Sequence, residues 1–344
     1  MKRITLLVSL CSVSVSFALK AQTYEVTHTF TVGGTGGWDY VFPDPPTHRL
    51  FVARSNRLMV VDMNDGRLIA ELPGLNGAHG VAMAPGTGHA FATSGEDSSV
   101  VMFDAKTYKI LAKIHAADDA DAIIYDPATK NIFTMNGDAN SSTVIDPRTG
   151  AVIATIPLGG KPEEGQSARN GMIYANLTDS SRIVEVDAKN ARLTGKSWST
   201  APCTNPVSLA IDTRRERLFS GCRNGMMAIS DYKNGRVVAT APVGRGVDGG
   251  GYDPAKRDAY TSNGDGTLTV VHQDTPDPYH VVENVATAQG ARTMTIDPAT
   301  HRIYTVSAKF GPVPAESTAT NPRRRPPILP GTFMVIVVEP VGTH

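Results

Sequence analysis

The sequence predicts an all-β protein, a seven-bladed β-propeller with four antiparallel strands in each blade. Three observations predict it: two markers recur at a near-constant spacing, and the two ends of the chain complement each other as parts of one blade. Short β-rich runs separated by Gly, Asp, Asn and Pro take the place of helical periodicity. A fixed period that holds four short strands is typical of a propeller blade.

The first marker is an aspartate that ends an apolar run and precedes a turn. Its successive spacings are 42, 42, 41 and 44 residues. The marker occurs at Asp62, Asp104, Asp146, Asp187 and Asp231. Such regularity indicates a structural repeat.

The second marker is an Asp-Pro or similar turn followed by a strand with an aromatic or apolar pair. It occurs at Asp44, Ala84, Asp126, Asp212, Asp253 and Asp297. The fourth repeat keeps the strand, at Gly171 to Leu177, and lacks the aspartate. Counting that repeat gives seven blades, each of which holds a strand before the turn, one after it, one that ends at the first marker, and a fourth.

The ends of the chain support the count of seven. A strand from Tyr24 has no blade before it, whereas Phe333 to Pro340 reads as a third strand with no fourth behind it. Joining the two completes the last blade and removes the open edges of an unclosed array. A six-bladed ring with a separate tail would leave two strands unused.

The first 21 residues have the layout of a secretory signal peptide. Lys2 and Arg3 precede an apolar and small run from Ile4 to Ala18, which is shorter than the ~20 residues of a membrane-spanning helix. We therefore expect a signal peptide over 1–21, one propeller domain over 22–344 with no transmembrane segment, and a periplasmic or secreted location. Removal of the signal leaves 30 basic and 33 acidic residues. That balance makes nucleic acid an unlikely partner.

Two cysteines remain after the signal peptide, Cys203 and Cys222. An even pair in an oxidising compartment predicts a disulfide. Two separate buried thiols are the alternative. A bridge between these positions would join the loop before the fifth blade to the end of a following strand.

The repeat resembles the YVTN-type family of bacterial β-propellers over nearly all of the mature chain. Four segments carry the resemblance: 125–134, 144–160, 159–177 and 261–271. The family includes proposed binding proteins as well as relatives of metal-dependent lactonases. The resemblance therefore implies the fold more specifically than the function.

Seven loops that lead into the innermost strands should meet at one mouth of the central channel. Placed in register, they contribute Asp39, His79, Asp121, Glu163, Asn205, Asp248 and Arg292. A hydrated polar lining is the ordinary interpretation, and a ligand-binding site is the functional one. Oxygen donors also suit Ca²⁺ or another hard divalent cation. The candidate metal ligands are Asp121, Glu163, Asn205 and Asp248, together with Asp39.

One loop is far longer than its counterparts in the other blades. Residues 310–331, rich in Pro, Ser, Thr and Arg, lie within the last blade. Loops of this length are often functional lids or disordered segments. Arg323, Arg324 and Arg325 are predicted to cover the acidic mouth or to clamp an anionic ligand, unless the loop is simply solvated.

Two hypotheses for function follow. The first is an exported binding or scaffold propeller, expected to be a monomer, that recognises a small molecule or a protein partner at the mouth. The second is a Ca-type hydrolase of lactones or esters, in which the metal polarises a carbonyl and activates water while a carboxylate or His79 acts as base. Gly-x-Ser-x-Gly, Cys-x-x-Cys-His and closely spaced His pairs are missing. Their absence argues against serine-hydrolase and soft-metal chemistry.

Overall fold

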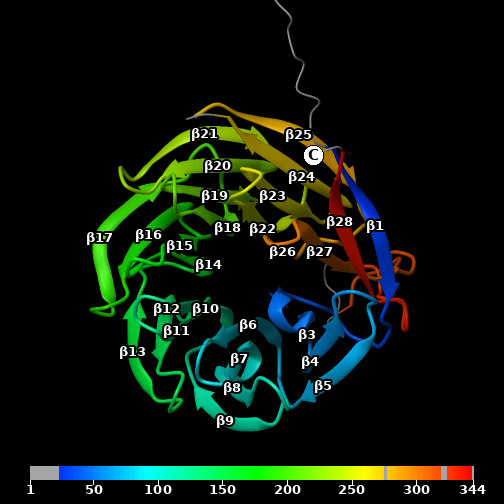
Figure 1. The fold of residues 1–344 in the computed structure, drawn as a ribbon, viewed down its shortest axis with the longest axis horizontal. Helices are drawn as coiled ribbons and strands as arrows, with labels where there is room; N and C mark the ends of the chain where they lie inside the picture. Colours follow the sequence, from blue (N-terminus) through cyan, green and yellow to red (C-terminus); the bar gives the residue numbers. More distant parts are fainter. Residues whose placement is uncertain (1–22, 275–276, 319–323, 343–344) are drawn as a thin grey trace, which may run out of the picture.

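The fold is a closed ring of seven sheets around a central axis (Figure 1). The computed structural model describes residues 23–274, 277–318 and 324–342, so the predicted signal peptide over 1–21 lies outside the described residues. Each sheet has four antiparallel strands, which confirms the predicted seven-bladed β-propeller. No helix in these segments is long and apolar enough to cross a membrane.

The first four blades follow the chain from the inside of the ring outward. Blade one is β2 (Val41–Asp44), β3 (Arg49–Arg54), β4 (Arg57–Asp62) and β5 (Leu68–Pro73). Blade two is β6 (Ala78–Ala84), β7 (His89–Ser94), β8 (Ser99–Asp104) and β9 (Ile110–His115). Blade three is β10 (Ala120–Asp126), β11 (Asn131–Asn136), β12 (Ser141–Ile145) and β13 (Val152–Pro157). Blade four is β14 (Pro162–Ser167), β15 (Met172–Leu177), β16 (Arg182–Asp187) and β17 (Arg192–Ser199).

The remaining blades continue this order. Blade five is β18 (Pro206–Asp212), β19 (Arg217–Cys222), β20 (Met226–Asp231) and β21 (Arg236–Pro242). Blade six is β22 (Val247–Asp253), β23 (Asp258–Asn263), β24 (Thr267–Gln273) and β25 (Tyr279–Ala286). Blade seven contains β26 (Met294–Asp297), β27 (Arg302–Ser307), β28 (Met334–Val341) and β1 (Thr23–Thr31). Two short 3-10 turns, η1 (Pro45–Thr47) and η2 (Gly95–Asp97), follow β2 and β7.

The N-terminal strand closes the ring, as the sequence predicted. β1 pairs antiparallel with β28 and forms the outer edge of blade seven (Figure 1). The Tyr24 hydroxyl donates to Asp258 Oδ2 over 2.6 Å and lies 2.9 Å from the Tyr260 hydroxyl. Because Asp258 and Tyr260 belong to blade six, these contacts also attach the closing strand to the neighbouring blade.

The two aspartate markers make different hydrogen bonds. The first marker accepts backbone N–H groups in the turn between the third and fourth strands, as Asp104 Oδ1 does from Lys106 and Thr107. The second marker is buried at Asp126, Asp212 and Asp253, where it also contacts the next blade; for example, Tyr252 donates to Asp212 over 2.9 Å. The repeat therefore encodes both the turns and the joints between blades.

An aromatic residue near the middle of each second strand packs the blades together. All seven are 2% exposed or less, and they are Phe51, Phe91, Phe133, Tyr174, Phe219, Tyr260 and Tyr304. Apolar clusters combine residues of neighbouring blades around them. A buried aromatic side chain brings a large apolar area into each of these interfaces.

The predicted disulfide is confirmed. Cys203 and Cys222 are bonded, both are fully buried, and their Cα atoms lie 5.7 Å apart. The bond joins the loop that precedes β18 to the end of β19. It therefore anchors the rim of blade five beside the channel mouth.

Candidate functional site

A β-bulge sets the direction of the side chains at the mouth. In blades two to six the pairing of the innermost strand shifts by one residue at its start, for example between Ala78 and Val81 and between Ala120 and Ile123. Bulges of this kind redirect side chains and are common beside functional sites. In blades two, three, four and six, the residue after the first strand position is charged or ionisable and lines the mouth: His79, Asp121, Glu163 and Asp248.

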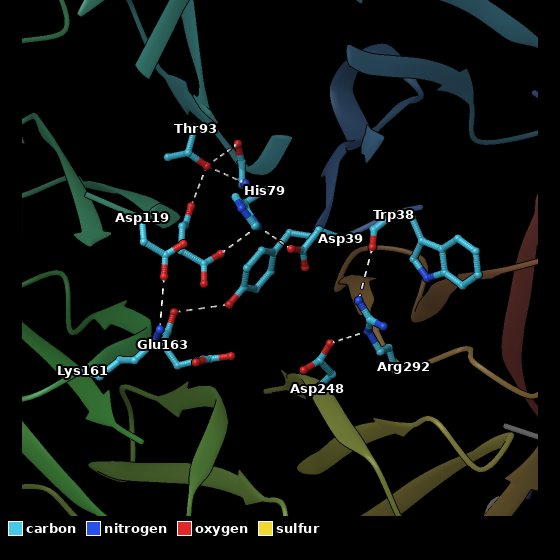
Figure 2. Close-up of polar contacts among 12 residues, drawn as sticks. Trp38, Asp39, His79, Thr93, Asp119, Lys161, Glu163, Asp248 and Arg292 are labelled. Carbon is cyan, nitrogen blue, oxygen red and sulfur yellow. Dashed lines mark hydrogen bonds and ion pairs between the residues drawn. The ribbon is translucent and has the colours of Figure 1, made fainter. Parts of the chain in front are cut away.

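The mouth is a cavity of about 510 Å³. Six of the seven residues that the sequence placed there line it: Asp39, His79, Asp121, Glu163, Asp248 and Arg292. They come from blades one, two, three, four, six and seven, and Figure 2 shows several of them directed toward the same space. The ring thus brings together side chains that are about 40 residues or more apart in sequence.

Asn205 is not among these residues. It is exposed, adopts a left-handed backbone conformation with φ 52°, and its Nδ2 donates to the Thr178 carbonyl over 3.0 Å. The equivalent position in the innermost strand of blade five is Val207, which is fully buried. The outer strand of blade four, β17, spans eight residues where β13 spans six, so counting loop lengths selected a rim residue two positions early.

Three of the polar residues form one compact group. His79 Nδ1 lies 2.6 Å from Asp39 Oδ2 and 3.4 Å from Asp121 Oδ1 (Figure 2). Burial lowers the pKa of His79, but the hydrogen bond to Asp39 and the charge of Asp121 outweigh it and raise the pKa to about 9. The imidazolium form therefore prevails at neutral pH and lies between two carboxylates.

Two further carboxylates at the mouth have arginine partners. Arg292 Nε donates to Asp248 Oδ2 over 2.6 Å, and Arg223 Nη2 lies 3.6 Å from Glu163 Oε1. Burial and the charge of Asp248 raise the pKa of Glu163 to about 7, although Arg223 opposes the shift. Arg223, in the loop between β19 and β20, was not predicted at the site, because that loop reads as a tight turn.

Tyr40 divides the central channel. Its ring lines the mouth and also a second cavity of about 810 Å³ at the other end of the innermost strands. The Tyr40 hydroxyl donates to the Glu163 carbonyl over 3.3 Å, across the channel from blade one to blade four. We call the second space the lower cavity. Nothing in the local sequence around Tyr40 signals this position, since it depends on the width of the ring.

Glu164 lines the lower cavity, next to the mouth residue Glu163. Its Oε2 accepts the Leu209 N–H over 2.7 Å and its Oε1 accepts from Gln166 Nε2 over 3.2 Å. Burial raises the pKa of Glu164 to about 8, although these two hydrogen bonds oppose the shift. The sequence could have singled out Glu164 by its size. The equivalent positions in blades two, three, five and six hold small residues: Gly80, Ala122, Ser208 and Gly249.

The long loop reaches the mouth through one arginine. Arg325 lines the mouth cavity, whereas Arg324 Nε donates to the Pro314 carbonyl over 2.8 Å within the loop. Arg323 lies outside the described residues. An isolated bridge between Phe310 and Ile328 closes the base of the loop.

The donor atoms of Asp39, His79 and Asp121 lie within 4.8 Å of one another, so these residues could hold a metal ion. A protonated His79 already compensates both carboxylates in this group. The predicted oxygen-rich set is arranged differently, because Asp248 and Glu163 pair with arginines and Asn205 lies apart. The residues at the mouth fit a network of internal ion pairs better than a calcium cage.

Comparisons with known proteins show the fold alone. No protein-family profile matches the chain. No curated protein matches it either. Among solved structures, a chain of hydrazine synthase from Kuenenia stuttgartiensis superposes with a TM-score of 0.70 at 16% identity, over 81% of this chain and 94% of that one. The chain is therefore similar in fold to a propeller protein, and its function has to be argued from its own site.

Proposed function

We propose that the chain is an exported binding propeller of the YVTN type whose channel mouth recognises a small polar molecule or a polar group of a partner protein. The observation that carries this proposal is that all seven blades contribute charged or ionisable side chains to one cavity of about 510 Å³. A cavity of that size suits a small ligand.

The distribution of charge indicates the chemistry of the ligand. The carboxylates are the less exposed groups, with Asp121 and Glu163 side chains 16% and 17% exposed, whereas those of Arg292 and Arg223 are 40% and 58% exposed. Inner carboxylates favour a positive group and outer guanidinium groups favour a carboxylate. The mouth therefore suits a ligand that carries both charges, such as an amino acid or a peptide terminus.

Thermal unfolding with a ligand panel tests the proposal. Free amino acids and short peptides should raise the melting temperature, whereas neutral sugars should not, because a ligand stabilises the state that it binds. Asp248→Asn and Arg223→Gln should each reduce the shift. Glu96→Gln is the matched control, since Glu96 is exposed and does not line the mouth. Equal shifts in all variants, or none with any charged ligand, would contradict binding at the mouth.

The metal-dependent hydrolase remains a weaker hypothesis, because the mouth carboxylates already have cationic partners. Millimolar Ca²⁺ or Mn²⁺ is expected to leave the melting temperature unchanged. A metal-dependent shift that Asp121→Asn abolishes, together with hydrolysis of a lactone, would favour the hydrolase instead. The same carboxylate would then be a metal ligand rather than the partner of His79.

A further inference from the structure

The lower cavity has the features of a second ligand site. All seven innermost strands contribute to its wall, and its volume of about 810 Å³ lies within the range of small-molecule pockets. Tyr40 separates it from the mouth. A ligand in the lower cavity would therefore meet a different set of side chains from a ligand at the mouth.

The wall of the lower cavity combines apolar, aromatic and polar side chains. Phe42, Tyr125 and Tyr252 line it with Tyr40, and aliphatic side chains such as Met83 and Ile296 fill the intervals between them. Aromatic faces attract organic cations as well as apolar groups. An apolar body with a positively charged head would satisfy this wall.

Two carboxylates line the lower cavity, Glu164 and Asp212. Asp212 is already paired with Arg215 over 3.2 Å, so Glu164 is the one that such a head would meet. Its two hydrogen-bond donors, the Leu209 N–H and the Gln166 amide, are uncharged, and no lysine, arginine or histidine of the described residues forms an ion pair with it. The mouth carboxylates Asp39, Asp121, Glu163 and Asp248 each have a cationic side chain within 4.0 Å. A buried carboxylate gains most from a charged hydrogen-bond donor.

We propose that the lower cavity binds a small organic cation, an ammonium group attached to an aliphatic or aromatic body, with the ammonium at Glu164. The ammonium supplies the positive charge that the protein itself does not place there. The apolar body contacts the aromatic wall. This site is separate from the one proposed at the mouth and does not depend on it.

Two arginines at the lower cavity could instead bind an anionic ligand, so the test has to compare a cation with an anion. Arg169 and Arg214 line the lower cavity and are exposed, so an organic anion is the competing occupant. The anion would place its charge at these arginines and would not use Glu164. A set of ligands of one shape and different charge separates the two.

Isothermal titration of the purified chain with three aromatic probes is the test. Phenethylammonium is the cation, 2-phenylethanol is its neutral counterpart and 3-phenylpropanoate is the anion. Phenethylammonium should bind at least about tenfold more tightly than the other two, as expected for one charge-assisted hydrogen bond. Equal or tighter binding of the alcohol or the anion, or no binding of the cation, would overturn the proposal.

Variants locate the bound cation. Glu164→Gln should weaken phenethylammonium about tenfold and leave 2-phenylethanol unchanged, since glutamine keeps the size and an acceptor. Glu96→Gln is the control, and it should leave both affinities unchanged because Glu96 is exposed and lines neither cavity. Thr295→Phe, which fills the lower cavity from blade seven, should weaken both probes. An unchanged affinity for phenethylammonium in Glu164→Gln would refute the assignment.

Discussion

The mouth and the lower cavity lie on opposite sides of Tyr40 and differ in the cationic partners of their carboxylates. At the mouth, His79 forms ion pairs with Asp39 and Asp121, and Arg292 forms one with Asp248. In the lower cavity Glu164 has only uncharged donors. Neighbouring residues of one innermost strand can line different spaces, as Glu163 and Glu164 of β14 do. The carboxylates at the mouth have cationic partners within the protein, whereas Glu164 has none among the described residues.

The largest expected effect comes from removing the internal cation of the mouth. His79→Gln should lower the free energy of unfolding by about 3 kcal/mol at neutral pH. Without the imidazolium, the partly buried carboxylates of Asp39 and Asp121, each 40 or more residues from His79 in sequence, face each other with no cation between them. Urea unfolding measures the change. The deficit should shrink as the pH falls and the carboxylates become protonated, beginning with Asp121, because burial and the charge of Asp39 raise its pKa. A loss under about 0.5 kcal/mol at neutral pH would show that the carboxylates do not depend on His79.

Removing the divider between the two regions should have the next largest effect. Tyr40→Ala is expected to lower the free energy of unfolding by about 2.5 kcal/mol, since it joins the two cavities and removes an aromatic side chain from the channel. Tyr40→Phe keeps the ring and loses one hydrogen bond of 3.3 Å, so a change below about 1 kcal/mol is expected. Equal effects of the two substitutions would contradict a packing role for the ring.

The raised pKa values at the mouth and in the lower cavity should both make the free energy of unfolding fall as the pH rises. Glu163 and Glu164 have folded pKa values raised to about 7 and about 8, so the folded state holds protons that the unfolded state releases above about pH 4.5. The pKa of His79, raised to about 9, adds stability that is present below about pH 6.5 and is lost as the pH rises through 9. Unfolding between pH 5 and 9 should therefore show stability falling with pH, by about 2 kcal/mol. Rising stability across this range would refute the shifts.

The smallest effect should distinguish the lower carboxylate from those at the mouth. Glu164→Gln is expected to raise the free energy of unfolding by about 1 kcal/mol at pH 9, because a buried charge without a cationic partner is replaced by a neutral amide. Asp248→Asn should be destabilising at the same pH, since it leaves Arg292 without its carboxylate. Urea unfolding of both variants measures the two changes in the free energy of unfolding. Changes of the same sign would contradict the proposed difference between the two carboxylates.

The repeat made much of the fold predictable from the sequence. Spaced aspartates predicted the blades because each one accepts backbone N–H groups in a turn, as Asp104 does. The strand from Tyr24 and the final strand were paired correctly because each lacked a partner. Cys203 and Cys222 were paired from number and compartment alone. Six of the seven predicted positions line the mouth because the loops that lead into the innermost strands recur at a near-constant spacing.

The sequence by itself thus determined the number of blades, the closure of the ring and the polar character of the mouth, since all three follow from local turns and a period. Only the tertiary structure decided that Val207 rather than Asn205 holds the equivalent position in blade five, because the longer outer strand of blade four moves that position by two residues. It also decided that Arg223 meets Glu163 and that Tyr40 spans the channel. The first contact joins neighbouring blades four and five, and the second joins blades one and four across the channel, so distance along the chain carries no information about either distance in space.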